Sequence, residues 1–417
     1  MNVLYVTSYD RDGQQFNGYL LHKALKARGH VSHMAVMDRF FDEPDVHALG
    51  GPKLRRINLQ LTEIEQSLSL YAVLPILSTA LYRQPYYKTA DIVHLELIHA
   101  RQFFSLLNLP VMSRQHPLVW TMHDPWLLSG HCVHPLTCER WLTGCGHCPD
   151  LGVNFLVQSD TTAFTWKLKK AVMHYSSVSL IVASEWMLDR VKRSPILSHL
   201  PCHVIPFGVD TAVFSPGDKE QCRSSLGIPE DAFVIAFRSV PFSRNFKGTE
   251  YVEKALLSLN SRKPVYLLTF EGVGGLDSLR GKFPFVELDW VTDRSQLVRA
   301  LSAADVFLMP SIAETFGMMA VESMACGTPV VTFEGTSLKG VIHAPSGGIA
   351  VPYRDHEALA GAVEKLIEDR SLLKTLSDNA LRIVREEYTL DLYIKRHLDL
   401  YQSMLNGRRS GRMGSGL

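Results

Sequence analysis

The sequence predicts two α/β domains of the doubly wound type, one after the other. The chain has 417 residues, which corresponds to roughly two to four compact units and excludes a single small domain. Short apolar runs suited to buried parallel strands alternate with helical patterns. This alternation breaks at 208–218, where glycine and proline gather, and then starts again. We therefore expect the domains to cover 1–212 and 213–388.

The first domain is expected to follow a strand–helix–strand order. A helix is predicted over 18–28, directly after the first strand. The predicted strands are 2–7, 30–37, 92–97, 118–122, 180–184 and 204–207. Residues 42–90 show no clear strand pattern, and we expect an insertion rich in Leu and Tyr there.

The second domain repeats this order and ends in a separate helix. A helix is predicted over 249–259. The predicted strands are 233–237, 265–270, 285–288, 306–309, 330–333 and 349–351. An amphipathic helix is expected within 389–405, and the tail at 406–417, rich in Gly, Arg and Ser, is expected to be disordered. Paired domains of this kind place the carboxyl ends of their strands beside a cleft, where ligands bind.

Charge and composition exclude several classes of protein. Lys and Arg number 43 and Asp and Glu 42, so the net charge of +1 provides no global field to hold a nucleic acid. Any anion-binding site must therefore be local. The N-terminal residues MNVLYVTSYD lack the features of a secretory signal, and we expect a cytoplasmic protein.

An uncharged stretch at 66–82 raises the question of membrane contact. It has 17 residues and contains Pro75, so it is shorter than the roughly 20 residues that a spanning helix needs. Lys53, Arg55 and Arg56 precede it. One interpretation is an interfacial segment that docks at the inner face of the cell membrane to reach a lipid-linked acceptor. The other, which we favour, is a helix buried against the first sheet.

Two glutamates flank the start of one predicted helix in the second domain. Glu314 precedes the helix and Glu322 lies on it. The N–H groups of Gly317, Met318 and Met319 come at the positive end of the helix dipole, which suits a diphosphate. Glu322 can accept hydrogen bonds from ribose hydroxyls. A single glutamate here would more often be a solvated residue of the first helical turn.

Basic residues follow the first strand of the second domain. Arg238 ends that strand, and Lys247 precedes the next helix, with Arg244 between them. Fixed cations at this point would stabilise the charge of a departing diphosphate in a closed, dry cleft. Taken alone, each cation would more often be solvated.

Polar residues in the first domain lie where strands end. Gly13 follows the first strand, and His123 and Asp124 end the strand at 118–122. His94 and Glu96, at the preceding strand, are weaker candidates for acceptor contacts. A lone histidine at a strand end is more often structural than functional.

Several of these segments together resemble one enzyme family. Residues 310–330 match P-S-x-x-E-x-F-G-x4-E-x-M-A-x-G-x-P-V, the form of the E-x7-E signature of retaining family-4 glycosyltransferases, also known as glycosyl transferases group 1. Lys247-Gly248 is similar to the family's K-G, and 121–124 to its T-x-H-D. Residues 204–216 look like the segment between the family's domains. The resemblance covers nearly the whole chain.

The resemblance implies a GT-B fold and a nucleotide diphosphate sugar as donor. It implies that Glu322 binds the donor's ribose and Glu314 the donor sugar, and that the backbone of 317–319 holds phosphate or sugar oxygens. His123 would touch the donor sugar, and the loop at Gly13 would reach toward the phosphates. The last helix would return toward the first domain. No catalytic metal is expected.

The chain departs from the family pattern at three points, one of which is Phe207, where the segment between the family's domains has Asn. Phe237 stands where the family usually has glycine before the arginine, and the following loop is long, so Arg238 and Arg244 both compete for the diphosphate. Asp12 replaces one glycine of the usual pair at Gly13.

Four of the seven cysteines cluster in a loop at 131–149. Cys132, Cys138, Cys145 and Cys148 have the spacing C-x5-C-x6-C-x2-C, which suits a tetrahedral structural zinc. Packed free thiols are an equally weighted alternative. The segment also resembles a subgroup of bacterial surface-polysaccharide glycosyltransferases, which favours a saccharide acceptor.

Together the patterns predict a hexosyltransferase-type enzyme (EC 2.4) that acts with retention, in bacterial cell-envelope polysaccharide biosynthesis. The acceptor would be a saccharide, free or lipid-linked. A sugar-nucleotide epimerase of GT-B fold and a non-catalytic sugar-nucleotide-binding protein stay open as alternatives. A dehydrogenase is disfavoured because no G-x-G-x-x-G follows the first strand of either domain. The donor's base and sugar, the acceptor, the linkage and the oligomeric state are left open.

Overall fold

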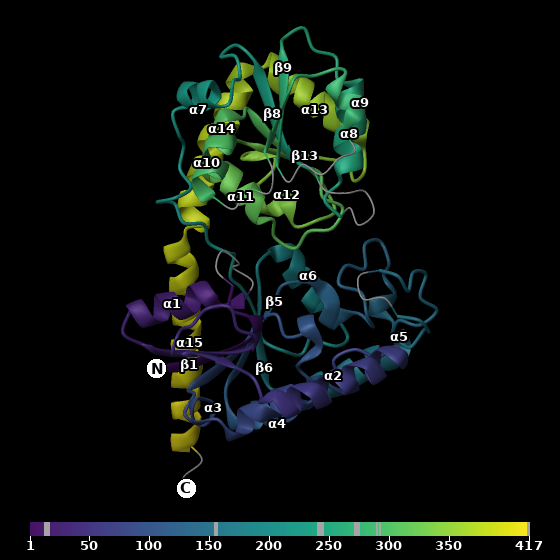
Figure 1. Ribbon diagram of the computed structural model, residues 1–417, viewed down its shortest axis with the longest axis vertical. Helices are drawn as coiled ribbons and strands as arrows, with labels where there is room; N and C mark the ends of the chain where they lie inside the picture. Colours follow the sequence, from purple (N-terminus) through teal and green to yellow (C-terminus); the bar gives the residue numbers. More distant parts are fainter. Residues whose placement is uncertain are drawn as a thin grey trace. The chain divides into compact units, whose positions relative to one another are not determined.

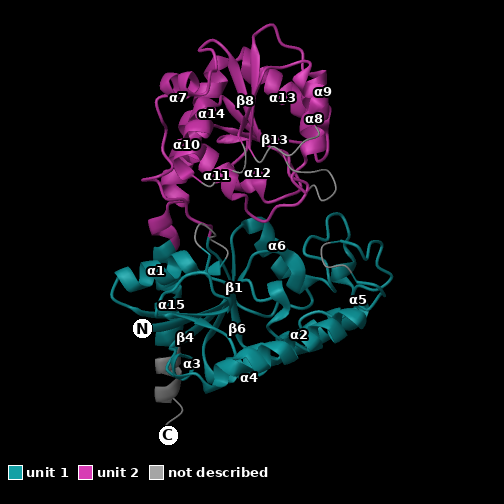
Figure 2. Cartoon of the chain, in the orientation of Figure 1, with its two compact units in different colours: residues 1–205, 394–417 teal, residues 206–393 magenta. Residues whose placement is uncertain are grey.

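The computed structural model describes residues 1–11, 17–153, 157–239, 246–270, 276–288, 291 and 293–414, with side chains as far as 407. The chain forms two compact units (Figure 2). Unit 1 comprises 1–205 and 394–417, and unit 2 comprises 206–393. Each unit is built around one parallel sheet with its own buried apolar core, so the predicted doubly wound α/β class is confirmed.

Unit 1 contains a seven-stranded sheet in the order β3-β2-β1-β4-β5-β6-β7. Its strands are β1 (Asn2–Tyr9), β2 (Val31–Asp38), β3 (Val46–Ala48), β4 (Ile92–Leu95), β5 (Leu118–Met122), β6 (Val178–Val182) and β7 (Cys202–Val204). All pairings are parallel. The central strands are mostly apolar and almost completely buried, as expected where helices cover a parallel sheet on both sides.

Helices α1 and α15 lie on one side of this sheet, and α2, α4 and α5 lie on the other (Figure 1). The helices of unit 1 are α1 (Tyr19–Ala27), α2 (Pro52–Ser67), α3 (Pro85–Lys88), α4 (Leu109–Gln115), α5 (Thr162–His174) and α6 (Glu185–Arg193). Short 3-10 helices cover Leu77–Arg83, Ala100–Gln102, Leu106–Asn108, Pro125–Leu128 and Arg140–Leu142.

The expectation that 42–90 contains no strand is wrong. Strand β3 lies there and pairs with β2, but three residues are too few to show an alternating pattern. Helix α2 also lies there, and it buries a polar face. The carboxylate of Glu65 accepts hydrogen bonds from the backbone amides of three consecutive residues, 72–74, and so holds the irregular chain that follows α2.

The uncharged stretch at 66–82 is therefore not one helix. It leaves α2 after Ser67, continues as irregular chain and then enters the 3-10 helix Leu77–Arg83, where Leu77 and Leu81 are completely buried. Our preferred prediction, a single helix buried against the first sheet, is therefore wrong for this stretch. No helix in the part of the chain that the structure describes is both long and apolar enough to cross a membrane.

Unit 2 contains a six-stranded parallel sheet in the order β10-β9-β8-β11-β12-β13. Its strands are β8 (Phe233–Arg238), β9 (Val265–Phe270), β10 (Phe285–Leu288), β11 (Val306–Met309), β12 (Val330–Phe333) and β13 (Gly348–Val351). Its helices are α7 (Lys219–Ser225), α8 (Thr249–Ser258), α9 (Asp277–Arg280), α10 (Arg294–Ala303), α11 (Met318–Ala325), α12 (Leu338–Val341), α13 (His356–Glu368) and α14 (Arg370–Glu387). Within this unit, α8, α9 and α13 cover one side of the sheet, and α7, α10 and α14 cover the other (Figure 1).

Two strands of unit 1 begin and end earlier than predicted. The run predicted as 180–184 is β6, which ends at Val182, because Ser184 caps α6 by accepting a hydrogen bond from the Met187 amide. The run predicted as 204–207 is β7, which ends at Val204. Phe207 is apolar for another reason: it packs against Phe316 in unit 2.

The C-terminal helix α15 (Leu390–Gly414) continues well beyond the predicted end at 405. The disordered tail expected at 406–417 is therefore wrong as far as Gly414, and 415–417 lie outside the described residues. Gly407 and Gly411, which lie within this helix, each cost it only about 1 kcal/mol, which their neighbours can offset. The helix begins in unit 2 and then joins unit 1, where the Tyr401 hydroxyl contacts the Tyr5 hydroxyl at 3.2 Å.

The start of α15 is fixed by a close crossing within unit 2. Val209 forms a parallel bridge with Thr389, and a Cβ atom at Gly208 would lie 2.6 Å from the Cα of Leu390. Only glycine allows the two segments to approach so closely. The division by contacts falls at 205/206 and so precedes this crossing, whereas the sequence placed the boundary at 212/213.

Candidate functional site

The candidate site residues fall into two groups, one in each unit. In unit 2, the first group begins where β11 ends and α11 starts. Gly317 caps α11 with φ 97°, and a Cβ atom there would lie 2.4 Å from Leu338 Cδ2, so the turn requires glycine. The amides of Met318 and Met319 lie in the first turn of α11, where a helix has no carbonyl to offer them. This helix start is suited to an anion.

An ion pair lies at the same helix start. Lys247 Nζ is 2.6 Å from Glu314 Oε2, and the side chains are 31% and 13% exposed. The pair joins segments that are far apart in the sequence. Gly248 makes this possible, because a Cβ atom there would lie only 2.0 Å from the Pro310 carbonyl oxygen. Since Lys247 is partly open to solvent, its ammonium can exchange the glutamate for an incoming anion.

Glu322 lies further along α11, facing two arginines. Burial raises the pKa of its carboxyl to about 7, and the positive charges of Arg294 and Arg238 oppose this shift. Arg238, at the end of β8, therefore acts on the same site as Glu322. The structure brings together the predicted Lys247, Glu314, Gly317–Met319 and Glu322.

In unit 1, the second group lies at the ends of β4 and β5. His123 Nε2 is 2.8 Å from Glu96 Oε2, and both side chains are nearly completely buried. Burial raises the pKa of the Glu96 carboxyl, and His123 opposes the rise. The pair holds the imidazole of His123 in one orientation at the end of its strand.

Asp124 is held by a partner that the sequence analysis missed. Its Oδ2 lies 2.9 Å from His99 Nε2, and its Oδ1 accepts a hydrogen bond from the Trp126 amide. Burial raises the pKa of Asp124, but His99 and this amide lower it by more, so it lies below the usual value. The His99 ring stacks on Trp126 at 4.8 Å. No sequence signal distinguishes His99 from other histidines that follow strands.

His94 is not an acceptor contact, contrary to the weaker sequence expectation. It is completely buried, and both of its ring nitrogens are engaged, with the Tyr401 hydroxyl at 2.6 Å and the Thr121 hydroxyl at 2.7 Å. Burial lowers its pKa well below the usual value, so the ring stays neutral. It fixes α15 to β4. Glu96 is likewise buried and contacts His123 rather than solvent.

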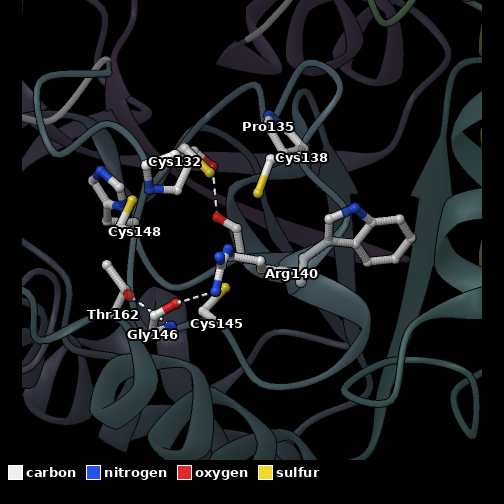
Figure 3. Close-up of a pocket in the computed structure, with 12 residues that line it drawn as sticks. Cys132, Pro135, Cys138, Arg140, Cys145, Gly146, Cys148 and Thr162 are labelled. Atoms are coloured by element: carbon white, nitrogen blue, oxygen red, sulfur yellow. Dashed lines mark hydrogen bonds between the residues drawn. The ribbon is translucent and has the colours of Figure 1, made fainter.

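Two predicted residues, Gly13 and Arg244, lie outside the described residues. Whether Arg238 or Arg244 contacts a diphosphate therefore stays a prediction. The four cysteines of the loop at 131–149 line one small cavity, and all are free thiols (Figure 3). Across the described residues, no three His, Cys, Asp or Glu side chains are arranged so that they could hold a metal ion. A zinc site therefore also stays a prediction.

The sequence of unit 2 matches one family. Residues 218–382 match the model of glycosyl transferases group 1. A D-inositol 3-phosphate glycosyltransferase 1 of Catenulispora acidiphila is 31% identical over 233 residues, which is 50% of this chain and 53% of that protein. A D-inositol 3-phosphate glycosyltransferase of Acidothermus cellulolyticus is 30% identical over 223 residues, 50% of this chain and 49% of that protein. The chain thus spans about half the length of the curated relatives it matches.

Solved structures resemble the chain over nearly its whole length. Sucrose-phosphate synthase from Thermosynechococcus elongatus has a TM-score of 0.69 at 19% identity and covers 98% of this chain and 100% of its own. Anabaena HepE, in complex with UDP and glucose, has a TM-score of 0.66 at 17% identity, and the match covers 97% of this chain and 100% of that chain. WaaG, a glycosyltransferase involved in lipopolysaccharide biosynthesis, has a TM-score of 0.62 at 15% identity, and the match covers 96% of this chain and 99% of that chain. The GT-B fold is therefore confirmed, and within unit 2 the similarity to glycosyl transferases group 1 covers residues 218–382.

Proposed function

We propose that this protein, whose second unit is similar to glycosyl transferases group 1, transfers a hexosyl group from a nucleotide diphosphate sugar to a saccharide acceptor with retention. The ion pair between Lys247 and Glu314 at the start of α11, with Glu322 further along the same helix, carries the proposal. HepE, a protein of the same fold, has been solved with UDP and glucose, which supports a nucleotide-sugar donor.

The donor would be bound mainly by unit 2. Its diphosphate would lie against the first turn of α11, where the amides of Met318 and Met319 point along the helix axis. Lys247 would leave Glu314 for a phosphate oxygen, and Arg238 would add a second cation. Glu322 would bind the ribose hydroxyls. Because its pKa is about 7, this side chain is near the midpoint of its titration at neutral pH and can donate as well as accept.

The chemistry would need no general base. The bond between the sugar's anomeric carbon and the phosphate oxygen breaks, and the acceptor oxygen forms its bond to that carbon on the same face. The acceptor hydroxyl gives its proton to the departing phosphate oxygen. Lys247, an arginine and the helix start would stabilise the leaving diphosphate, and we expect no catalytic metal. Glu314 would face the donor sugar once Lys247 has moved to the phosphate.

Unit 1 would supply His123 for the donor sugar. The hydrogen bond between His123 Nε2 and Glu96 holds the imidazole in one orientation. Asp124, fixed by His99 and the Trp126 amide, would bind substrate beside it. These residues therefore depend on one another for their orientation.

Two acceptor classes are supported by different observations. The cysteine-rich segment resembles bacterial surface-polysaccharide glycosyltransferases, which favours a saccharide in cell-envelope polysaccharide biosynthesis. The relatives named D-inositol 3-phosphate glycosyltransferase favour a cyclitol phosphate instead. An assay that offers both acceptors with the same donor distinguishes them, because only one class should yield product.

Helix α2 supports a lipid-linked acceptor at an anionic membrane surface. It buries three polar residues, Asn58, Thr62 and Glu65, and several apolar side chains stand exposed among polar ones on its outer face. Ile57, Ile64 and Leu68 recur at helical spacing and are each about half exposed. Lys53 and Arg56 lie on the exposed first turns. Such a face suits the boundary between lipid headgroups and acyl chains.

Liposome flotation tests this contact. Vesicles with anionic lipid should carry the wild type upward in the gradient, and Ile57→Glu with Ile64→Glu should reduce the floating fraction severalfold. Leu107→Glu, a matched change at a half-exposed leucine of the same unit, is the control. Undiminished flotation of the folded double variant would remove α2 as the contact.

The transfer itself is tested with Lys247→Ala and Glu322→Ala. Both should lose transfer while keeping their circular dichroism spectra and cooperative unfolding. An epimerase would release altered donor without any acceptor, and a non-catalytic binding protein would bind the donor but neither transfer nor hydrolyse it. Full activity of either variant would refute the role of that residue.

A further inference from the structure

The loop at 131–149 brings most of the chain's cysteines to one place. Cys132, Cys138, Cys145 and Cys148 all line a cavity of about 20 Å³ (Figure 3). A space of this size holds one small particle such as a water molecule or an ion. The three other cysteines lie elsewhere, in β7, α7 and at the end of α11. Four thiols around one such space are an arrangement that soft metal ions select.

A buried histidine nitrogen at this cavity has no partner. His131 is 4% exposed and lines the cavity beside the cysteines. Its Nε2 atom has no hydrogen-bond partner among the described residues. A buried polar nitrogen without a partner costs about 1–3 kcal/mol, so its persistence here needs an explanation. A thiolate in the cavity would accept its N–H, as second-shell groups do around metal-bound ligands.

A buried lysine lies beside the same loop. The side chain of Lys169 on α5 is 1% exposed, and its Nζ donates hydrogen bonds to the carbonyls of Trp126 and Ser129 at 2.7 and 2.8 Å. No carboxylate forms an ion pair with it in the described part of the chain. Cys132, Cys145 and Asp124 interact with it electrostatically. A zinc ion with four thiolates carries two net negative charges and would balance this ammonium.

The loop buries few of its own side chains. Of its side chains, Trp141 is completely packed, and most of the others are partly or largely exposed. The backbone also adopts the left-handed region at three residues other than glycine, Leu136 (φ 52°), Cys145 (φ 55°) and His147 (φ 48°). Such residues persist only where surrounding structure holds them. The Gly130 amide already donates to Cys145 Sγ at 3.3 Å, a bond that favours the thiolate.

We propose that Cys132, Cys138, Cys145 and Cys148 bind one structural zinc ion. Because the thiols as placed do not yet form a group that could hold a metal, binding would draw them inward and deprotonate them. All four ligands come from the protein, so the ion would have no open position for substrate.

The site would stabilise the segment that follows His123 and Asp124. The loop is joined to α5 by the Gly146 amide, which donates to the Thr162 hydroxyl at 2.9 Å, and by Trp166, whose indole N–H donates to the Trp141 carbonyl. A zinc ion would therefore fix the end of β5 and the start of α5 together. This role does not depend on the proposed transfer reaction.

Metal content tests the proposal. The full chain, purified with a tag that lacks histidine and under reducing conditions, should contain one zinc per chain by inductively coupled plasma mass spectrometry. Cys138→Ser and Cys148→Ser should lose most of it. Cys202→Ser is the matched control, since Cys202 is also a partly buried free thiol but lies in β7, and it should keep the zinc.

A measurement on the wild type covers the case in which the loop variants do not fold. Cobalt(II) exchanged into the wild-type chain should give the intense visible absorption of tetrahedral thiolate coordination, and a thiol-specific mercurial should release the ion. Wild type with four reduced thiols in the loop and no zinc would overturn the proposal. Retention of zinc by folded Cys138→Ser and Cys148→Ser, or an internal disulfide found by mass spectrometry, would also overturn it.

Discussion

The two groups of site residues are built differently. In unit 2 the ion pair of Lys247 and Glu314 is partly exposed and lies on turns beside a helix start. In unit 1, Glu96, His123 and His94 are buried and joined by hydrogen bonds that reach as far as Tyr401, 307 residues along the chain from His94. Exposed charged side chains can change partners when a ligand binds, whereas buried charged side chains stay paired with each other. We infer that unit 2 supplies binding and charge stabilisation and that unit 1 supplies orientation.

The largest expected effect is on the exposed charge. Lys247→Ala removes one cation from the leaving diphosphate, and we expect kcat to fall about 10²- to 10³-fold. Because the lysine is partly open to solvent, the melting temperature should change little. Steady-state kinetics and thermal unfolding measure both. Lys374→Ala, which breaks an exposed ion pair with Asp378 on α14, is the control and should keep full activity.

A smaller effect is expected at a buried carboxylate. Glu96→Gln keeps the size of the side chain but weakens its hold on His123, and we expect kcat to fall about 10- to 100-fold through misorientation. KM for the donor should change less than kcat, which a merely structural role would not predict. Glu65→Gln, at another buried carboxylate of unit 1, is the control: it should lower stability without lowering kcat. An equal change of kcat in both variants would contradict the distinction.

The comparison also predicts that Glu322 lowers the stability of the folded chain at high pH although it serves donor binding. A carboxyl whose pKa is raised from 4.5 to about 7 by burial costs stability as pH rises from 4.5 to 7, because the folded chain then holds a proton that the unfolded chain has lost. Glu322→Gln should therefore be more stable than wild type at pH 8 by about 1–2 kcal/mol, allowing for partial exposure, and equal at pH 4. Donor affinity should fall. Urea unfolding at both pH values checks this.

The smallest expected effect is at the distant end of the hydrogen-bond network in unit 1. Tyr401→Phe removes the hydroxyl that contacts His94 Nδ1 and Tyr5. Leaving His94 with one unsatisfied nitrogen should lower the free energy of unfolding by about 1–3 kcal/mol, with kcat nearly unchanged. Thermal unfolding and kinetics measure both. A loss of activity larger than that of Glu96→Gln would show that α15 takes part in the site.

The unit 2 group could be predicted from the sequence because its residues are close together in the chain. Glu314, Gly317 and Glu322 occur within one turn and helix, so their order alone indicates their arrangement. Most strands were predictable for a similar reason, since parallel strands buried on both faces are continuous apolar runs. The three residues of β3 gave no such run. Helix α2 buries polar residues, which reverses the usual pattern.

The unit 1 group could be predicted only in part. His123 and Asp124 were found because they follow a strand, but their side-chain partners, Glu96 and His99, come from the segment after β4. His99 and Tyr401 reach the site only through the fold, so no local spacing reveals them. The same holds for Lys169, which lies on α5 beside the cysteine loop. Contacts made across the fold are therefore what the sequence did not show.

Diphosphate binding tests the account most directly. Thermal unfolding of the wild type with UDP, GDP, ADP and dTDP should show a concentration-dependent rise of the melting temperature with at least one of them, because a ligand that binds only the folded state stabilises it. Lys247→Ala should weaken that rise, and Lys374→Ala should keep it. No rise with any nucleoside diphosphate, or an equal rise in Lys247→Ala, would contradict the assignment of the α11 helix start and Lys247 as the donor's diphosphate site.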